Sequence, residues 1–194
     1  MEVFIYSMQA FLTVAILVYM GAHIYFDKKL GVPTCHTSAR ARRAILDFIP
    51  SEAPSTAAPL HIVEMGSGWG GVAMAIARAR PHSRVVGIEY SIFPFLISIF
   101  RKKLNPALKN LEFVRADFFN YSLKNASIVV CYLLVPMLER LRGKFLAELP
   151  ADACIISNNY LMPGWTAEKT IEVNGLIDDK RVSLYTMAKV RQTQ

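Results

Sequence analysis

From residue 60 onward the sequence alternates short apolar runs with longer amphipathic segments, and this alternation constrains the fold more than any other feature. The apolar runs have the length and the Val and Ile content of buried strands, whereas the segments between them have helical spacing. Strands that alternate with helices form right-handed βαβ units around a mostly parallel sheet. Strands are predicted at residues 60–65, 84–89, 111–116, 126–132 and 153–159, and helices at 37–49, 72–80, 93–104 and 136–149.

Two further strands are predicted near the C-terminus, at residues 168–174 and 182–190. The sequence predicts no helix between them, so they should pair antiparallel. The predicted fold class is therefore α/β, with a Rossmann-like, seven-stranded, mostly parallel sheet and an antiparallel C-terminal strand.

A glycine-rich turn joins the first strand to the helix that follows it. Residues 64–71 read EMGSGWGG. Glycines at such a turn allow backbone conformations that other residues avoid, and they let the chain approach a ligand closely. The free N–H groups at the start of the helix add the positive end of a dipole. Gly66, Gly68 and Gly71 alone match the GxGxxG pattern, which also occurs in nicotinamide and flavin sites.

Acidic residues near three strand ends favour S-adenosylmethionine as the cofactor. Glu64 stands where dinucleotide-binding strands usually carry an apolar residue, and its carboxylate can hold the ammonium end of S-adenosylmethionine. Glu89 ends the second strand and can accept hydrogen bonds from both ribose hydroxyls, a feature that NAD enzymes share. Asp117 follows the third strand and can accept from the adenine amino group, while Phe118 packs on the ring.

Each of these residues also has a structural interpretation. A glutamate at a strand end is often solvated, an aspartate after a strand is often a turn residue, and glycine turns occur in many α/β folds. The conjunction in this order favours a cofactor site. The predicted cofactor-binding residues are Thr34, Glu64, Gly66, Ser67, Gly68, Gly70, Glu89, Tyr90, Asp117 and Phe118.

The N-terminal segment from Val3 to Phe26 contains no charged residue. A helix of this length spans about 36 Å, enough for a hydrocarbon core of about 30 Å, so one transmembrane helix is predicted. Positive charges follow it, which places the remaining chain on the cytoplasmic side, or the matrix side in a mitochondrion. The alternative is a helix docked on the protein's own core. The predicted parts are an anchor (1–27), a linker with a lead-in helix (28–59) and a cofactor-binding domain (60–194).

The composition argues against several classes of site. The net charge of +7 suits an anionic partner, but the basic residues do not alternate with aromatic ones as in proteins that stack single-stranded bases. We therefore expect no nucleic acid. The three cysteines and four histidines are scattered without metal-ligand spacing, so we also expect neither a metal nor a disulfide framework.

The pattern resembles class I, seven-strand methyltransferases. More narrowly, it is similar to the small protein-lysine methyltransferases that include the archaeal broad-specificity enzymes and the mitochondrial ATP synthase c-subunit lysine methyltransferase family. The resemblance covers residues 30–190, although Cys35 stands where the family usually has a second proline. It is carried by the glycine turn and by the segments at 31–34 (GVPT), 132–134 (YLL), 138–149 (LERLRGKFLAEL) and 157–165 (SNNYLMPGW).

This resemblance implies N-methylation of a lysine in a protein substrate, membrane proteins included, with Tyr132 at the reaction centre. Packing of Tyr132 on the core is the alternative interpretation. Asn158 and Asn159 can orient the acceptor or lie in a surface loop, and Trp165 can line a lysine channel or anchor the core. Competing functions are methylation of a small or lipid-like acceptor, a non-catalytic membrane module that binds the cofactor or a partner, and an NAD-dependent enzyme.

Overall fold

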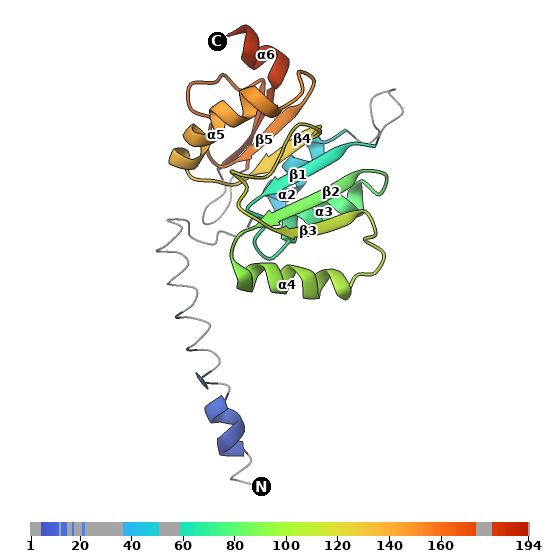
Figure 1. Ribbon diagram of the computed structural model, residues 1–194, viewed down its shortest axis with the longest axis vertical. Coiled ribbons are helices and arrows are strands. Elements are labelled where there is room, and N and C mark those ends of the chain that lie inside the picture. The colour runs from blue at the N-terminus through green and yellow to red at the C-terminus, as the bar shows by residue number, and fades with distance from the viewer. Residues whose placement is uncertain are drawn as a thin grey trace. The chain divides into compact units, whose positions relative to one another are not determined.

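The computed structural model describes residues 5–11, 13, 14, 17, 21, 37–50, 59–173 and 180–193. The chain divides into two compact units, Met1–Cys35 and His36–Gln194. The described residues of the first unit are helical and exposed. The labelled helices and strands of Figure 1 all belong to the second unit.

Seven strands form one mixed sheet at the centre of the second unit (Figure 1): β1 (His61–Met65), β2 (Arg84–Glu89), β3 (Leu111–Arg115), β4 (Ile128–Cys131), β5 (Cys154–Asn158), β6 (Lys169–Glu172) and β7 (Arg181–Thr186). Their order across the sheet is β3-β2-β1-β4-β5-β7-β6. Strands β1 to β5 pair in parallel, whereas β7 runs antiparallel to both β5 and β6. The predicted seven-stranded, mostly parallel sheet with an antiparallel C-terminal strand is therefore present.

Helices cover both faces of the sheet. One face carries α2 (Ala39–Phe48), α3 (Gly71–Ala79) and α4 (Ile92–Lys103), and the other carries α5 (Val135–Glu148) and α6 (Met187–Gln192). Ser38 is the N-cap of α2, because its Oγ accepts a hydrogen bond from Ala41 N at 3.1 Å. Pro136 lies in the first turn of α5, where its missing N–H costs nothing.

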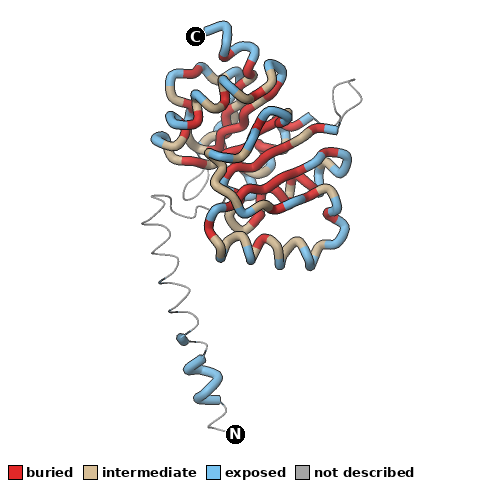
Figure 2. The backbone as a smooth tube through the Cα atoms, in the orientation of Figure 1, coloured by how far each residue is buried: buried red, intermediate tan, exposed pale blue. Residues whose placement is uncertain are grey.

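Two apolar cores lie on the two faces of the sheet. Successive residues of a strand point to opposite faces, so β1 contributes Ile62 to one core and Val63 and Met65 to the other. Figure 2 shows the central strands as buried. Because helices cover both faces, these strands are apolar at nearly every position, and a carboxylate inside one of them, such as Glu64, needs a specific partner.

The last predicted strand is shorter than expected. Residues 182–190 were expected to be extended, but β7 ends at Thr186 and the helix α6 follows. Thr186 lies opposite Cys154, the first residue of β5, so the ladder between the two strands ends there. Met187 N instead donates to Ala153 O at 2.9 Å, and the Met187 side chain is buried.

The prediction of a transmembrane helix over residues 3–26 is corrected. Among the residues that the structure describes, no helix combines the length and the apolar character needed to cross a bilayer. The predicted single-pass membrane localisation and the predicted bilayer contact of this segment depended on that helix, so both are corrected as well. Only residues 5–11, 13, 14, 17 and 21 of the segment are described, and the rest of it lies outside the described residues.

Gly87 in β2 is required by a close approach, and this requirement can be tested. A Cβ at Gly87 would lie 2.7 Å from Phe113 Cδ1 and 3.0 Å from Ser67 Cβ. We expect Gly87→Ala to lower the free energy of unfolding by about 1–3 kcal/mol, as overpacking does. Gly143→Ala is the matched control, because a Cβ there meets nothing within 4 Å, and it should raise stability by about 0.5–1 kcal/mol. Urea unfolding measures both, and equal shifts would contradict the packing argument.

Candidate functional site

The predicted site residues that the structure describes lie at the edge of the sheet where the parallel strands have their carboxyl ends. Ligands of open α/β sheets bind outside these ends, at the point where the strand order reverses. Here β1 lies between β2 and β4, so the order reverses beside β1. The glycine turn follows β1 and therefore occupies this position.

The glycine turn is held against β2 by backbone hydrogen bonds. Ser67 N donates to Ile88 O at 2.8 Å, and Gly70 N donates to Ser67 O at 2.8 Å. Gly66, Gly68 and Gly70 have φ values of 72°, 53° and 76°. A Cβ at Gly70 would also overlap the Phe113 ring, so both its backbone conformation and its surroundings require glycine. Ser67 Oγ is buried, without a hydrogen-bond partner among the described residues.

The Glu89 carboxylate connects the glycine turn to the start of α4. It is buried at the end of β2. Its Oε2 accepts from Gly68 N at 2.8 Å, and its Oε1 accepts from Ser91 N at 2.7 Å. Each carboxylate oxygen offers two lone pairs, so each can still accept a hydroxyl donor.

The Glu64 carboxyl lies inside β1 and is 7% exposed. Its Oε2 accepts from Ala73 N, in the first turn of α3, at 2.8 Å. Glu64 thereby caps a helix whose N-cap, Gly70, has no side chain to do so. Burial raises the pKa of Glu64 to about 8, the hydrogen bond from Ala73 opposes this rise, and the charge of Glu89 adds to it. A cation beside Glu64 would lower that pKa and pair with the carboxylate.

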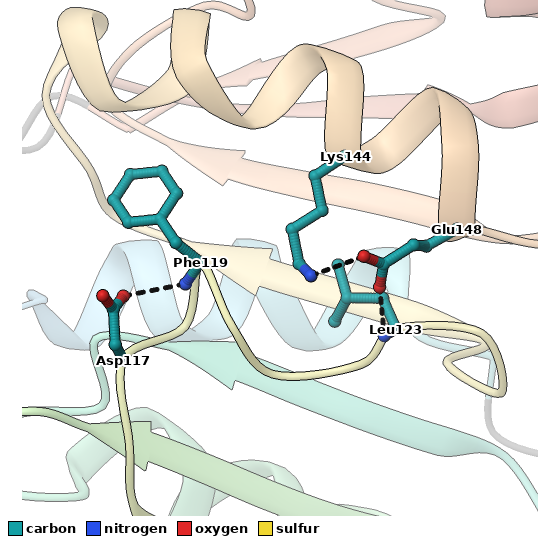
Figure 3. Close-up of polar contacts among 5 residues, drawn as sticks. All are labelled: Asp117, Phe119, Leu123, Lys144 and Glu148. Atoms are coloured by element: carbon teal, nitrogen blue, oxygen red, sulfur yellow. Dashed lines mark hydrogen bonds and ion pairs between the residues drawn. The ribbon is translucent and has the colours of Figure 1, made fainter.

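Asp117 follows β3 and forms a local turn, which Figure 3 shows. Its Oδ1 accepts from Phe119 N at 2.9 Å, the bond of an aspartate that stabilises its own turn. Phe118 is partly buried against one of the cores, and its ring centroid lies 4.7 Å from that of Phe119. The turn interpretation of Asp117 thus holds, and its contact with adenine stays a prediction.

Sequence reasoning missed the residue that anchors the loop after β3. Glu148, in the last turn of α5, accepts from Leu123 N at 2.8 Å and pairs with Lys144 Nζ at 2.6 Å (Figure 3). These contacts hold the loop that carries Asp117 against α5. The Lys144–Glu148 spacing of four residues was visible in the sequence, but its link to Leu123 was not.

Tyr132 lies just after β4, half-buried, beside residues that directly follow β5. Its hydroxyl accepts from Asn159 Nδ2 at 3.4 Å. Asn159 has a left-handed backbone with φ 68°, and its Oδ1 accepts from Lys180 N at 3.2 Å. Asn159 N also donates to Arg181 O at 2.7 Å. Asn159 therefore bridges the end of β5, the start of β7 and the Tyr132 hydroxyl.

The four other predicted residues have different outcomes. Thr34 and the rest of the lead-in at 31–36 lie outside the described residues. Tyr90 follows Glu89 and is 44% exposed. Trp165 is buried between Phe145 and Tyr185, with ring centroids 6.4 Å and 6.3 Å away, so it anchors the core. Asn158 is buried as the last residue of β5.

Comparison with protein families and relatives agrees with this arrangement. The family model described as the ANTKMT methyltransferase domain matches residues 64–169, more than half of the chain. A protein-lysine N-methyltransferase of Saccharolobus islandicus is 22% identical over 128 residues, covering 66% of this chain and 80% of that protein. The adenine nucleotide translocase lysine N-methyltransferase of Mus musculus is 27% identical over 141 residues, or 71% of this chain. That match spans only 57% of the mouse protein.

Solved structures show the same fold. An RNA methyltransferase from Salinibacter ruber, in complex with S-adenosyl-L-homocysteine, aligns with a TM-score of 0.68 at 22% identity, over 79% of this chain and 94% of that one. A tRNA methyltransferase of B. subtilis aligns with a TM-score of 0.60 at 11% identity, over 78% of this chain and 66% of that one. The family match and the two named relatives confirm the predicted resemblance to protein-lysine methyltransferases, and the solved structures confirm the fold.

The raised pKa of Glu64 predicts a pH-dependent stability. The folded protein holds a proton on Glu64 up to about pH 8, whereas the unfolded chain releases it near 4.5. This contribution to stability is complete below pH 4.5 and is lost as the pH rises to about 8. We expect Glu64→Gln to flatten the decline of the unfolding free energy in this window, by up to about 1.4 kcal/mol per pH unit. Urea titrations across the window measure this slope, and the exposed control Glu112→Gln should leave it unchanged.

Proposed function

Because the chain belongs to the ANTKMT methyltransferase domain family, we propose that it transfers methyl groups from S-adenosylmethionine to lysine side chains of a protein. The names of both relatives support lysine as the acceptor, and the S-adenosyl-L-homocysteine in the Salinibacter ruber structure supports the donor. One observation carries the proposal. Glu64, the glycine turn and Glu89 meet at the carboxyl ends of β1 and β2, inside the segment that the family matches.

The residues at this edge fit the chemistry of S-adenosylmethionine, which supplies an electrophilic methyl group when bound. Glu89 would accept the ribose hydroxyls with the lone pairs that Gly68 N and Ser91 N leave open. Glu64, whose pKa is raised, would ionise beside the cofactor's ammonium group. The glycine turn would let the backbone approach the cofactor closely, and Tyr90, Asp117 and Phe118 would surround the adenosine.

Tyr132 and Asn159 would orient the lysine that accepts the methyl group. A lysine must lose its proton before it attacks, and desolvation in a narrow pocket lowers its pKa from about 10.4. The Tyr132 hydroxyl can accept an N–H of the neutral amine and aim its lone pair. Asn159 Nδ2 positions that hydroxyl, while Lys180 N holds the Asn159 amide in the orientation that directs Nδ2 toward Tyr132. Positioning of this kind supplies much of the rate acceleration in a displacement reaction.

Binding of S-adenosylhomocysteine tests the cofactor site. We expect Glu89→Gln to weaken binding by about 10–100-fold, because it replaces a carboxylate that takes charge-assisted hydrogen bonds. Glu112→Gln is the matched control, since Glu112 is exposed on β3, and it should leave the affinity unchanged. Calorimetric titration of the full chain measures both. A folded protein that bound NAD and not S-adenosylhomocysteine would contradict the proposal.

Methyl transfer itself tests the role of Tyr132. Removal of its hydroxyl in Tyr132→Phe should slow transfer by about tenfold or more and leave S-adenosylhomocysteine affinity unchanged. Tyr121→Phe, in the loop after β3, serves as the control with full activity. The assay follows labelled methyl groups into methyl-lysine in acid hydrolysates of a protein extract. Label recovered on lipids or small molecules would instead favour the alternative acceptor.

A further inference from the structure

Helix α4 presents a stripe of large apolar side chains to solvent. Phe93, Leu96, Phe100 and Leu104 are 38%, 53%, 61% and 66% exposed. Their spacing of three, four and four residues places them on one side of the helix and its C-cap. A surface helix normally turns its polar face outward, and contiguous exposed apolar patches mark interaction sites.

The stripe cannot be buried by a rotation of the helix. The opposite side of α4 already packs on the sheet through Phe95 and Ile99, and Ser98 is fully buried with its Oγ donating to Phe95 O at 2.7 Å. Both sides of α4 are therefore apolar, and one of them has the sheet as its partner. Figure 1 shows α4 at the margin of the domain, next to β3.

Positive charge surrounds one end of the stripe. Arg101, Lys102 and Lys103 occupy the last turn of α4, and residues 90–111 contain Lys109 as well but no acidic residue. Arg101 and Lys103 lie on either side of the Phe100 and Leu104 row at helical spacing. Arg101 is held in place because its guanidinium donates to Trp69 O at 2.7 Å.

We propose that α4 docks on the anionic surface of a lipid bilayer. The apolar stripe would enter the boundary between headgroups and acyl chains, and the basic end would pair with anionic headgroups. The charge complementarity favours this occupant, since residues 90–111 carry only positive charge, and in a pair of chains joined through α4 these like charges would face one another. Such peripheral contact needs no membrane-spanning helix.

Docking through α4 would also set the position of the candidate cofactor site. The helix begins directly after Ser91, whose N–H donates to the Glu89 carboxylate. The site would therefore lie close to the membrane surface and would favour acceptors held there. The docking itself does not rest on the proposed methyl transfer.

A fluorescent reporter on α4 tests this proposal in the full-length protein. Phe100→Trp places an indole in the stripe. The fluorescence of this indole is obtained by subtracting the spectrum of the unsubstituted protein from that of the variant. Leu96→Trp is a second reporter, and Lys124→Trp, exposed in the turn before β4, is the matched control. The probes are phosphatidylcholine vesicles with brominated acyl chains, prepared with and without phosphatidylserine.

We expect the indoles at 100 and 96 to be quenched and blue-shifted with phosphatidylserine vesicles, and the indole at 124 to be unaffected. Added salt should reverse the quenching and the blue shift, because it screens the attraction between the basic residues and the headgroups. Lys103→Gln, exposed beside the stripe, should weaken vesicle partition by roughly fivefold, as expected for one basic residue near an anionic surface. Unquenched stripe reporters on a protein that still binds S-adenosylhomocysteine or melts cooperatively would overturn the proposal. A dimer seen by light scattering, with the reporters shifted in the absence of lipid, would equally overturn it and assign the stripe to self-association.

Discussion

The buried carboxylate of Glu89 is the interaction on which the arrangement of the site depends. It accepts one backbone N–H from the glycine turn and one from the start of α4. A buried carboxylate without such donors would be costly, and charge-assisted hydrogen bonds are stronger than neutral ones. The end of β2, the turn after β1 and the first residue of α4 are therefore positioned by one side chain. The Glu89 carboxylate therefore connects the candidate cofactor site to the start of α4, the helix that carries the exposed stripe.

Glu64 and Glu89 lie on neighbouring strands but in different electrostatic situations. Glu64 accepts a backbone hydrogen bond from Ala73 inside an apolar strand, and burial together with the charge of Glu89 raises its pKa to about 8. The raised pKa favours the protonated carboxyl at neutral pH, and a cation beside it would favour ionisation. The same edge of the sheet thus contains a carboxylate that organises the backbone and a carboxyl group that can respond to a positively charged ligand.

The proposed acceptor side of the site comes from the later part of the chain. The Tyr132 hydroxyl is positioned by Asn159, whose left-handed backbone and amide are in turn fixed by Arg181 and Lys180. The loop that carries Asp117 is anchored by Glu148 of α5. Asparagine is one of the few non-glycine residues that tolerate the left-handed region, and this conformation at Asn159 is accompanied by hydrogen bonds that join its backbone and its amide to the start of β7 and to Lys180.

The sequence by itself determined the order of the strands and of helices α2 to α5, the glycine turn and the acidic residues near the ends of the strands, because each of these depends on a local pattern. It also led to the correct family through several short motifs. Apolar length alone led to the membrane-spanning helix, which the described residues do not contain. Only the tertiary structure decided that β7 ends where β5 begins, that Asn159 reaches Tyr132, and that one side of α4 stays exposed. The physical reason is that such contacts depend on which distant strands become neighbours in the sheet. A helix that is apolar on both sides is expected from its sequence to be buried on both sides, and only the packing around it decides which side is covered.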